Sequence, residues 1–185
     1  RKTPIFGLDI LPSSESLAGA NIELVNFKNR ELQLKKVLNK IKNDYDFVLI
    51  DCLPSVGILN VNALAASDYV LIPVQSEFFA LAGLEQLLNI VDLVKRYLNP
   101  DLQILGAVVT MFDKRNHSDR NILNQLHKNF PGHVFNAVIP RQVSFAEAPG
   151  MGKSILHHDP YSKGARAYRE LAIEVLSRVF PSPNE

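Results

Sequence analysis

The feature that most constrains the fold is an alternation between short, nearly continuous apolar runs and segments with helical spacing. The five runs are residues 8–12, 47–52, 69–74, 104–112 and 134–139. They are continuous instead of alternating between apolar and polar residues, which is typical of strands covered on both faces. We therefore expect five buried strands.

The segments between these runs place apolar residues on one helical face. Such patterns occupy 30–43, 79–98 and 118–130, and a fourth starts at Asp159-Pro160 and extends to Pro181. An acidic residue followed by proline is a common helix start, so we expect Asp159 to cap this last helix. Strands alternating with helices of this length predict an α/β fold, with a doubly wound, mostly parallel sheet and helices on both faces.

Size and composition fit one globular domain. The chain has 185 residues, a formal net charge of +1 and one cysteine, Cys52. One cysteine excludes an intramolecular disulfide framework, and we expect it to fill a buried position because no histidine is placed to activate its thiol. The apolar runs are far shorter than the roughly 20 residues that span a bilayer. We expect residues 1–180 to form a single α/β domain and residues 181–185 to be a flexible tail.

Polar residues follow three of the apolar runs, at the edge of the sheet where open α/β folds bind ligands. Asp51 follows the apolar residues 47–50, where a carboxylate can hold Mg²⁺ beside the phosphates of a nucleotide. The alternative is an aspartate that caps a helix or satisfies a turn, which this segment taken alone favours. The other two loops are Thr110-Met111-Phe112-Asp113 and Pro140-Arg141. We expect the three loops to converge on one crevice.

The segment Gly150–Ser154 ends like a phosphate-binding P-loop but does not have the full pattern. Glu147 stands where the first glycine of that pattern belongs, and we expect neither a strand before the segment nor a helix opening from Ser154. A P-loop works because backbone N–H groups at a helix N-terminus surround the phosphates, and an acidic residue there repels them. We therefore exclude a P-loop at this position.

Two groups of basic residues stand out against the balanced overall charge. The first lies between Lys28 and Lys42 and is more typical of a solvated helix face than of a nucleic-acid patch. The second surrounds the loop 140–165 and comprises Arg141, Lys153, Lys163, Arg166 and Arg169. Acidic residues interrupt the second group, so composition alone indicates DNA binding only weakly.

Five linked blocks resemble the ParA/Soj family of chromosome- and plasmid-partitioning ATPases, within the MinD/ParA group of deviant P-loop proteins. The blocks are LPSSESLAGANIEL (11–24), YDFVLIDCLPSVGILNVNAL (45–64), VLIPVQSEFFALAGLEQLL (70–88), TMFDKR (110–115) and VIPRQVSFAEAPGMGKSILHHDPYSKGARAYRELAIEVL (138–176). They cover nearly the whole chain, and together they are far more specific than any single motif. The resemblance implies a P-loop NTPase-like fold.

The resemblance also implies a function: a Mg-ATP-dependent switch that dimerises, binds DNA without sequence preference and is stimulated by a ParB-like centromere-binding protein. By position, the resemblance implies that Asp51 acts on the Mg²⁺ shell through a water molecule. The adenine side would be lined by Thr110, Met111, Phe112, Asp113, Pro140 and Arg141. DNA would be met by Arg141, Lys163 and Arg166. The family implies a cytoplasmic, nucleoid-associated protein, and the ending VFPSPNE is not the basic amphipathic helix of a membrane-cycling relative.

The sequence departs from the family pattern in ways that leave two functions open. Leu53 replaces a proline, Ser144 replaces a basic residue and Lys163 replaces an arginine. The family's P-loop, KGGVGKT, is not among the 185 residues, so no catalytic residue is assigned and we expect weak or no binding of ATP. The chain is then either the C-terminal two-thirds of a partitioning ATPase, truncated at its N-terminus, or an inactive module that acts through dimerisation or partner contacts.

Overall fold

The computed structural model describes residues 1–53, 57–76 and 80–181, and these residues divide into two compact units. The first unit contains residues 1–67 and 91–100, and the second contains residues 68–90 and 101–185. Helix α4 (Ala80–Tyr97) begins in the second unit, and its residues from Val91 onward belong to the first.

The second unit is built on two parallel strands, β1 (Tyr69–Gln75) and β2 (Gln103–Thr110). The pairing shifts once, between Val70 and Leu71, and then continues to the pair Gln75 and Thr110. Burial is continuous in β2 from Leu105 to Val109, as expected for a strand covered on both faces, whereas β1 has exposed residues at Tyr69, Pro73 and Gln75. The predicted run 104–112 is therefore a strand, although β2 ends at Thr110 and the following residues form a loop.

A third extended segment, residues 133–139, runs beside β2 without being a regular strand. Phe135 N donates to Ala107 O at 2.8 Å and Ile139 N donates to Val109 O at 2.9 Å. The segment is joined by single parallel bridges, Ala107 to Val134 and Phe112 to Pro140. The predicted strand 134–139 is thus wrong as a regular strand but correct as a parallel neighbour, because only part of its backbone pairs with β2.

Gly106 permits this close approach. A Cβ atom at position 106 would lie 2.7 Å from Phe135 Cε2 and 2.8 Å from the backbone oxygen of His133. Such distances are far below van der Waals contact, so a side chain larger than hydrogen does not fit there.

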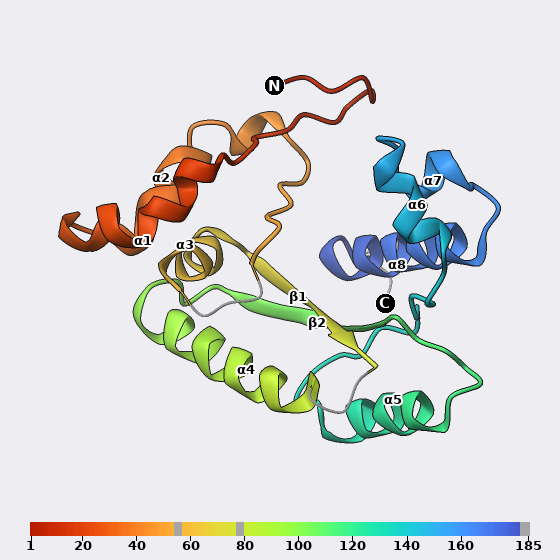
Figure 1. Ribbon diagram of the computed structural model, residues 1–185. Helices are drawn as coiled ribbons and strands as arrows, with labels where there is room; N and C mark the ends of the chain where they lie inside the picture. The colour runs from red at the N-terminus through yellow and green to blue at the C-terminus, as the bar shows by residue number, and fades with distance from the viewer. Residues whose placement is uncertain (54–56, 77–79, 182–185) are drawn as a thin grey trace. The chain divides into compact units, whose positions relative to one another are not determined.

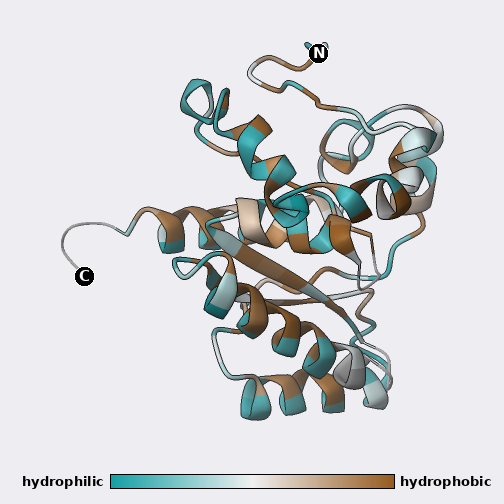
Figure 2. Ribbon diagram, turned by 90° about the vertical axis from the view of Figure 1, so that its left-hand side faces the viewer, coloured by the Kyte–Doolittle hydropathy of each residue, from teal (hydrophilic) through white to brown (hydrophobic). Residues whose placement is uncertain are grey.

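Helices cover both faces of the strands in this unit (Figures 1 and 2). On one face, Leu84 of α4 and Leu126 of α5 (His117–Asn129) pack with Ile72, Val74 and Val109. On the other face, α8 (Lys163–Val179) packs through Ala167, Leu171 and Val175 against Leu105, Val108 and Phe135. The predicted α/β class, a parallel sheet with helices on both faces, is confirmed.

The last predicted helix begins later than expected. Ser162 caps α8, because its hydroxyl accepts a hydrogen bond from Ala165 N at 3.1 Å. Asp159 instead follows a short helix, α7 (Ile155–His158), and its backbone oxygen accepts from Ser162 Oγ at 2.8 Å. The prediction of Asp159 as cap was wrong, because serine three residues further on supplies the same chemistry. The predicted tail, apart from Pro181, lies outside the described residues.

The first unit consists of short helical segments. They are η1 (Glu15–Gly19), α1 (Ala20–Glu23), η2 (Leu24–Asn26), η3 (Arg30–Leu32), α2 (Gln33–Leu38), η4 (Lys42–Asp44) and α3 (Ile58–Ala66). The predicted helix 30–43 is therefore broken into three pieces. Lys36 and Lys40 are four residues apart, where like charges destabilise a helix, and the turn after Leu38 tightens to i→i+3 bonds such as Ile41 N to Leu38 O.

Two predicted strands of this unit, 8–12 and 47–52, are not strands in the part of the chain that the structure describes. Residue Asp9 makes a single antiparallel bridge with Lys2, and Tyr45 Oη donates to Asp9 Oδ2 at 2.8 Å. In the second run, Leu49 is 90% exposed. A strand requires a hydrogen-bonded ladder, and an apolar run does not form one by itself.

Two buried asparagines organise the first unit. Asn62 accepts from Leu34 N at 3.1 Å and donates to Arg30 O at 2.8 Å and to Ile58 O at 2.9 Å, so it joins η3, α2 and α3. Asn99 donates to Leu64 O and Ser67 O. These amide groups satisfy backbone groups at the ends of short helices, which water would otherwise have to reach.

Candidate functional site

The carboxyl ends of β1 and β2 meet at one edge of the sheet in the second unit. Ser76 directly follows β1, and its backbone N–H donates to Thr110 O at 3.2 Å. Thr110 ends β2, is half-buried, and its hydroxyl donates to Val74 O at 3.5 Å. In open parallel sheets this edge is the usual position of a ligand site.

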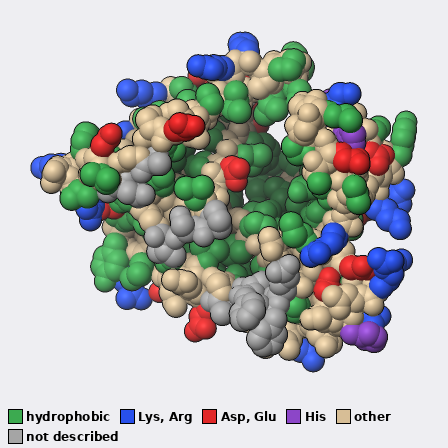
Figure 3. Space-filling view, in the orientation of Figure 1, with side chains coloured by type: hydrophobic (Ala, Val, Ile, Leu, Met, Phe, Trp, Pro, Cys, Tyr) green, Lys and Arg blue, Asp and Glu red, His purple; other side chains and the backbone are tan. Residues whose placement is uncertain are grey.

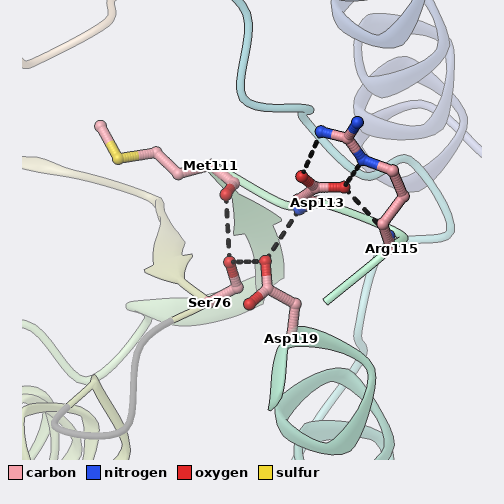
Figure 4. A network of polar contacts seen from close by, with 5 residues as sticks. All are labelled: Ser76, Met111, Asp113, Arg115 and Asp119. Carbon is pink, nitrogen blue, oxygen red and sulfur yellow. Dashed lines mark hydrogen bonds and ion pairs between the residues drawn. The ribbon is translucent and has the colours of Figure 1, made fainter. Parts of the chain in front are cut away.

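The loop after β2 turns sharply at Met111, which has a positive φ of 54°. Ser76 Oγ lies 3.1 Å from Met111 O and 2.9 Å from Asp119 Oδ2. The same oxygen of Asp119 accepts a hydrogen bond from Asp113 N at 2.8 Å. Figure 4 shows these groups converging on the space between the strand ends and the first turn of α5, while the Met111 side chain points away from Asp113.

Arg115 occupies both carboxylate oxygens of Asp113. Its Nε donates to Oδ1 at 3.1 Å, its Nη2 lies 2.9 Å from Oδ2, and its backbone N–H donates to Oδ1 at 3.0 Å. These hydrogen bonds, the side-chain ones first, lower the pKa of Asp113 to about 2, and the charge of Arg141 acts in the same direction. Asp113 is therefore a carboxylate at neutral pH, held by a neighbour in its own loop.

The loop at Ile139-Pro140-Arg141, called the IPR loop here, lies directly beside the loop after β2. Phe112 N donates to Ile139 O at 3.1 Å, and Arg141 N donates to Phe112 O at 3.1 Å. These bonds continue the parallel pairing of 133–139 with β2 beyond the strand and place Arg141 next to Asp113. Two of the three predicted loops thus meet at one place.

A pocket of about 280 Å³ opens here, lined by Ser76, Asp113, Asn116, Asp119 and Arg141. All five residues belong to the second unit. Asn116 caps α5, since its side chain accepts from Ser118 N at 3.0 Å. The lining combines acceptors with one guanidinium, which suits a polar, hydrogen-bonding ligand.

Comparison with known proteins gives concordant matches. A family model described as an AAA domain matches residues 1–104. The sporulation initiation inhibitor protein Soj of Bacillus subtilis is 48% identical over 175 residues, which are 95% of this chain and 69% of that protein. The chromosome partitioning protein ParA of Myxococcus xanthus is 44% identical over 97% of this chain and 63% of its own length. The chain belongs to the ParA/Soj family.

Solved structures share the fold of this chain. A cobyrinic acid a,c-diamide synthase from Mycobacterium smegmatis, crystallised with ADP and magnesium, has a TM-score of 0.77 and 36% identity over 91% of this chain and 62% of its own. McdA from Cyanothece, at 19% identity and a TM-score of 0.78, shares the fold. The chain spans about two thirds of the length of these ParA/Soj relatives and solved structures.

The residues that the family pattern assigns to Mg²⁺ and to DNA lie in different elements. Asp51 belongs to the first unit, where it is exposed and follows the apolar residues 47–50. Its carboxylate has the oxygen chemistry that Mg²⁺ prefers, and a single protein carboxylate is common for this ion. The next residue, Cys52, is exposed, so the expectation of a buried filler was wrong. Asp51 as a magnesium residue stays a prediction.

The predicted DNA-binding residues lie at the start of α8 and in the IPR loop. Lys163 is the first residue of α8, Arg166 lies in its first turn, and both are exposed. Gln142 Oε1 accepts from Gly164 N at 2.9 Å, which holds the IPR loop against this helix end. Arg141, also exposed, lines the pocket described above.

The segment that ends like a P-loop lies between two short helices. Helix α6 (Ser144–Gly150) precedes it, and α7 opens directly after Ser154, which contradicts the expectation that no helix begins there. A helix, not a strand, precedes the segment, and the helix that follows it has only four residues. The exclusion of a P-loop therefore rests on the incomplete sequence pattern and on the preceding helix.

Sequence reasoning missed three of the five lining residues, Ser76, Asn116 and Asp119. Ser76 had a signal, because it is a polar residue at the end of the predicted strand 69–74, two positions after its last residue. Asn116 also had one, because asparagine before a helical pattern is a common cap. Asp119 had none, because an acidic residue in the first turn of a helix is ordinarily explained by the helix dipole.

Among the described residues, no helix is both long enough and apolar enough to cross a membrane.

Proposed function

We propose that this chain supplies the base side of the nucleotide site of a ParA/Soj-type partitioning ATPase. The observation that carries the proposal is the pocket in which Asp113 and Arg141 meet, in a chain that is 48% identical to Soj. Of the six predicted adenine-side residues, Asp113 and Arg141 line the pocket. Thr110, Met111, Phe112 and Pro140 belong to the same two loops and would flank the base, and Asp51 would contribute a carboxylate to a Mg²⁺ shell. Bound Mg²⁺ would neutralise phosphate charge; the residues of this chain would hold and orient the nucleotide.

Arg141 is the residue from which we expect the main contact to the adenine. Both carboxylate oxygens of Asp113 already accept hydrogen bonds from Arg115, so fewer of their lone pairs remain to accept hydrogen bonds from the base. Arg141 is fixed by its own backbone bond to Phe112 and brings a planar guanidinium to the pocket. A guanidinium can stack on the face of an aromatic ring, and its planar N–H groups can donate hydrogen bonds to acceptors at the edge of a base.

Further parts of the proposal concern the assembly. Lys163 and Arg166 at the exposed start of α8, with Arg141, would contact DNA phosphates, and such contacts weaken as salt increases. We propose that the family protein works as a homodimer with a ParB-like centromere-binding partner, at the nucleoid, and that residues 1–180 form one domain of it. An inactive module that retains only dimerisation or partner contacts is the alternative function.

The experiment compares adenosine, ADP and Mg-ATP by ¹H–¹⁵N NMR titration of the chain. If this chain supplies the base side, all three ligands bind weakly, with similar affinity, and shift the amides of Asp113 and Arg141. Arg141→Ala should weaken adenosine binding about tenfold, the loss of one charge-assisted contact. Lys128→Ala, an exposed basic residue near the other end of α5, is the control and should bind as the parent does.

Two results would contradict the proposal. If the chain bound guanosine with the same affinity as adenosine, the pocket would not be an adenine site. Micromolar affinity for Mg-ATP with negligible affinity for adenosine would show that phosphate contacts, and not the base side, dominate.

A further inference from the structure

The loop after β2 is held from inside by a buried carboxylate. Asp119 is 5% exposed and Ser76 is 5% exposed. One oxygen of Asp119 accepts from both Ser76 Oγ and Asp113 N, at 2.9 and 2.8 Å. A buried carboxylate is costly unless it is hydrogen-bonded, so its retention here points to a requirement of the loop.

The carboxylate of Asp119 is directed at the loop and not at its own helix. Asn116 caps α5 through Ser118 N. Asp119, in the first turn of the same helix, instead contacts groups from two other segments, the end of β1 and the loop at Asp113. Figure 4 shows its carboxyl group turned toward these two segments. A helix-start role therefore does not account for these contacts.

Met111 is where the held loop is under most strain. Its φ of 54° lies in the left-handed region, which side chains other than glycine, asparagine and aspartate rarely adopt. Ser76 Oγ, which is bound to Asp119, is also 3.1 Å from Met111 O. The surrounding contacts must hold such a residue in place, because its backbone does not favour this conformation.

The held loop also determines the position of Arg141. Phe112, between Met111 and Asp113, accepts the backbone hydrogen bond of Arg141. Asp119 accepts from Asp113 N on one side of Phe112, and the single hydroxyl proton of Ser76 is shared between Asp119 Oδ2 and Met111 O on the other side. A shift of this loop therefore moves the backbone to which Arg141 is bonded.

We propose that Asp119, together with Ser76, is a positioning residue that fixes Met111–Asp113 and through Phe112 sets the place of Arg141 in the pocket. The proposal rests on the proposed function for the role of the pocket as a nucleotide site. Whether Asp119 and Ser76 hold the loop can be measured without any nucleotide.

The experiment uses the full chain and two readouts. The first is amide hydrogen exchange of Asp113 without nucleotide, with Val109 in the core of β2 as internal reference. The second is adenosine affinity. Asp119→Ala and Ser76→Ala should each speed exchange at Asp113 about tenfold, with Val109 unchanged, and weaken adenosine binding about tenfold. Asp119→Asn retains an oxygen acceptor and should stay within about threefold of the parent.

Rescue separates positioning from a general loss of stability. Glycine adopts a positive φ freely, so Met111→Gly added to Ser76→Ala should return the exchange of Asp113 toward the parent value. The matched control is Asp92→Ala, an exposed aspartate on α4, which should change neither readout. A general destabilisation would speed exchange at Val109 as well and would not be rescued at Met111.

Each outcome is decisive. Unchanged exchange at Asp113 in both Asp119→Ala and Ser76→Ala overturns the proposal, as does failure of the glycine rescue. If Asp119→Ala does not fold, Ser76→Ala with and without Met111→Gly decides the question. A parent chain that does not bind adenosine overturns the proposed function alone, because loop exchange is then still measured and still decides whether Asp119 holds the loop.

Discussion

The two units of the molecule use different kinds of interaction to hold their backbone. In the second unit, Phe135, Val109 and Leu126 are almost completely buried between strands and helices. In the first unit, large apolar side chains such as Phe6, Phe27 and Leu49 are exposed, and buried Asn62 joins three helical segments through backbone hydrogen bonds. Figure 3 shows hydrophobic side chains on much of the visible surface.

The difference teaches what an apolar run needs before it becomes a strand. The runs 69–74 and 104–112 lie beside each other and form a ladder, and 134–139 adds to it. The run 47–52 is as apolar as these, yet it forms no ladder among the described residues. Apolar composition favours burial, but hydrogen-bonded pairing with a neighbour is what makes a strand.

The largest expected effect tests the core of the second unit. Phe135→Ala should lower the free energy of unfolding by about 3–5 kcal/mol, because it removes a fully buried ring and leaves a cavity. The matched variant Phe6→Ala, at a fully exposed position of the first unit, should change it by less than about 0.5 kcal/mol. Denaturant titration measures both. Similar values for the two variants would break the comparison between the units.

A smaller effect is expected from the amide contacts of the first unit. Asn62→Ala leaves Leu34 N without its side-chain acceptor and removes the side-chain donor to Arg30 O and Ile58 O, which should cost about 1–3 kcal/mol. Amide exchange should accelerate at Leu34 and stay unchanged at Val109 in β2. Asn39→Ala, an exposed asparagine of the same unit, is the control and should leave exchange at Leu34 as it is. Equal acceleration in both units would mean that they do not respond separately.

The smallest effect concerns acid pH at the edge of the second unit. Hydrogen bonds from Arg115 lower the pKa of Asp113 to about 2, so the folded protein binds this proton less readily than the unfolded chain. The contribution of the contact to stability is complete above about pH 4 and is lost as pH falls toward 2. The carboxyl ¹³C shift of Asp113 should report this midpoint. Arg115→Ala should raise it toward 3.8, and Lys114→Ala should not; an unchanged midpoint in Arg115→Ala contradicts the assignment.

The elements predicted correctly are those in which the apolar spacing of the sequence matches the face that is buried in the folded chain. The helical spacing at 79–98 and 118–130 corresponds to α4 and α5 within about two residues, because many apolar residues mark one face of each. The pattern at 30–43 failed because lysines on consecutive turns repel, and Asp159 failed as a cap because Ser162 competes for the same role.

The loops that form the pocket could be predicted from the sequence, but the buried side chain that holds one of them could not. Strand ends indicated the loops at Asp113 and Arg141, since parallel strands present their carboxyl ends at one edge. Asp119 was not predictable, because its importance comes from two segments that meet it only in the folded chain. Local sequence does not record such contacts.

Gly106 has a consequence for how this fold can change over evolutionary time. Among the atoms that a side chain there would meet is the backbone oxygen of His133, which no substitution removes. A smaller residue at position 135 would therefore not free the site for a larger one at 106. Gly106 and the segment 133–139 should be inherited together, and a relative with a bulkier residue at this position must carry that segment along a different path.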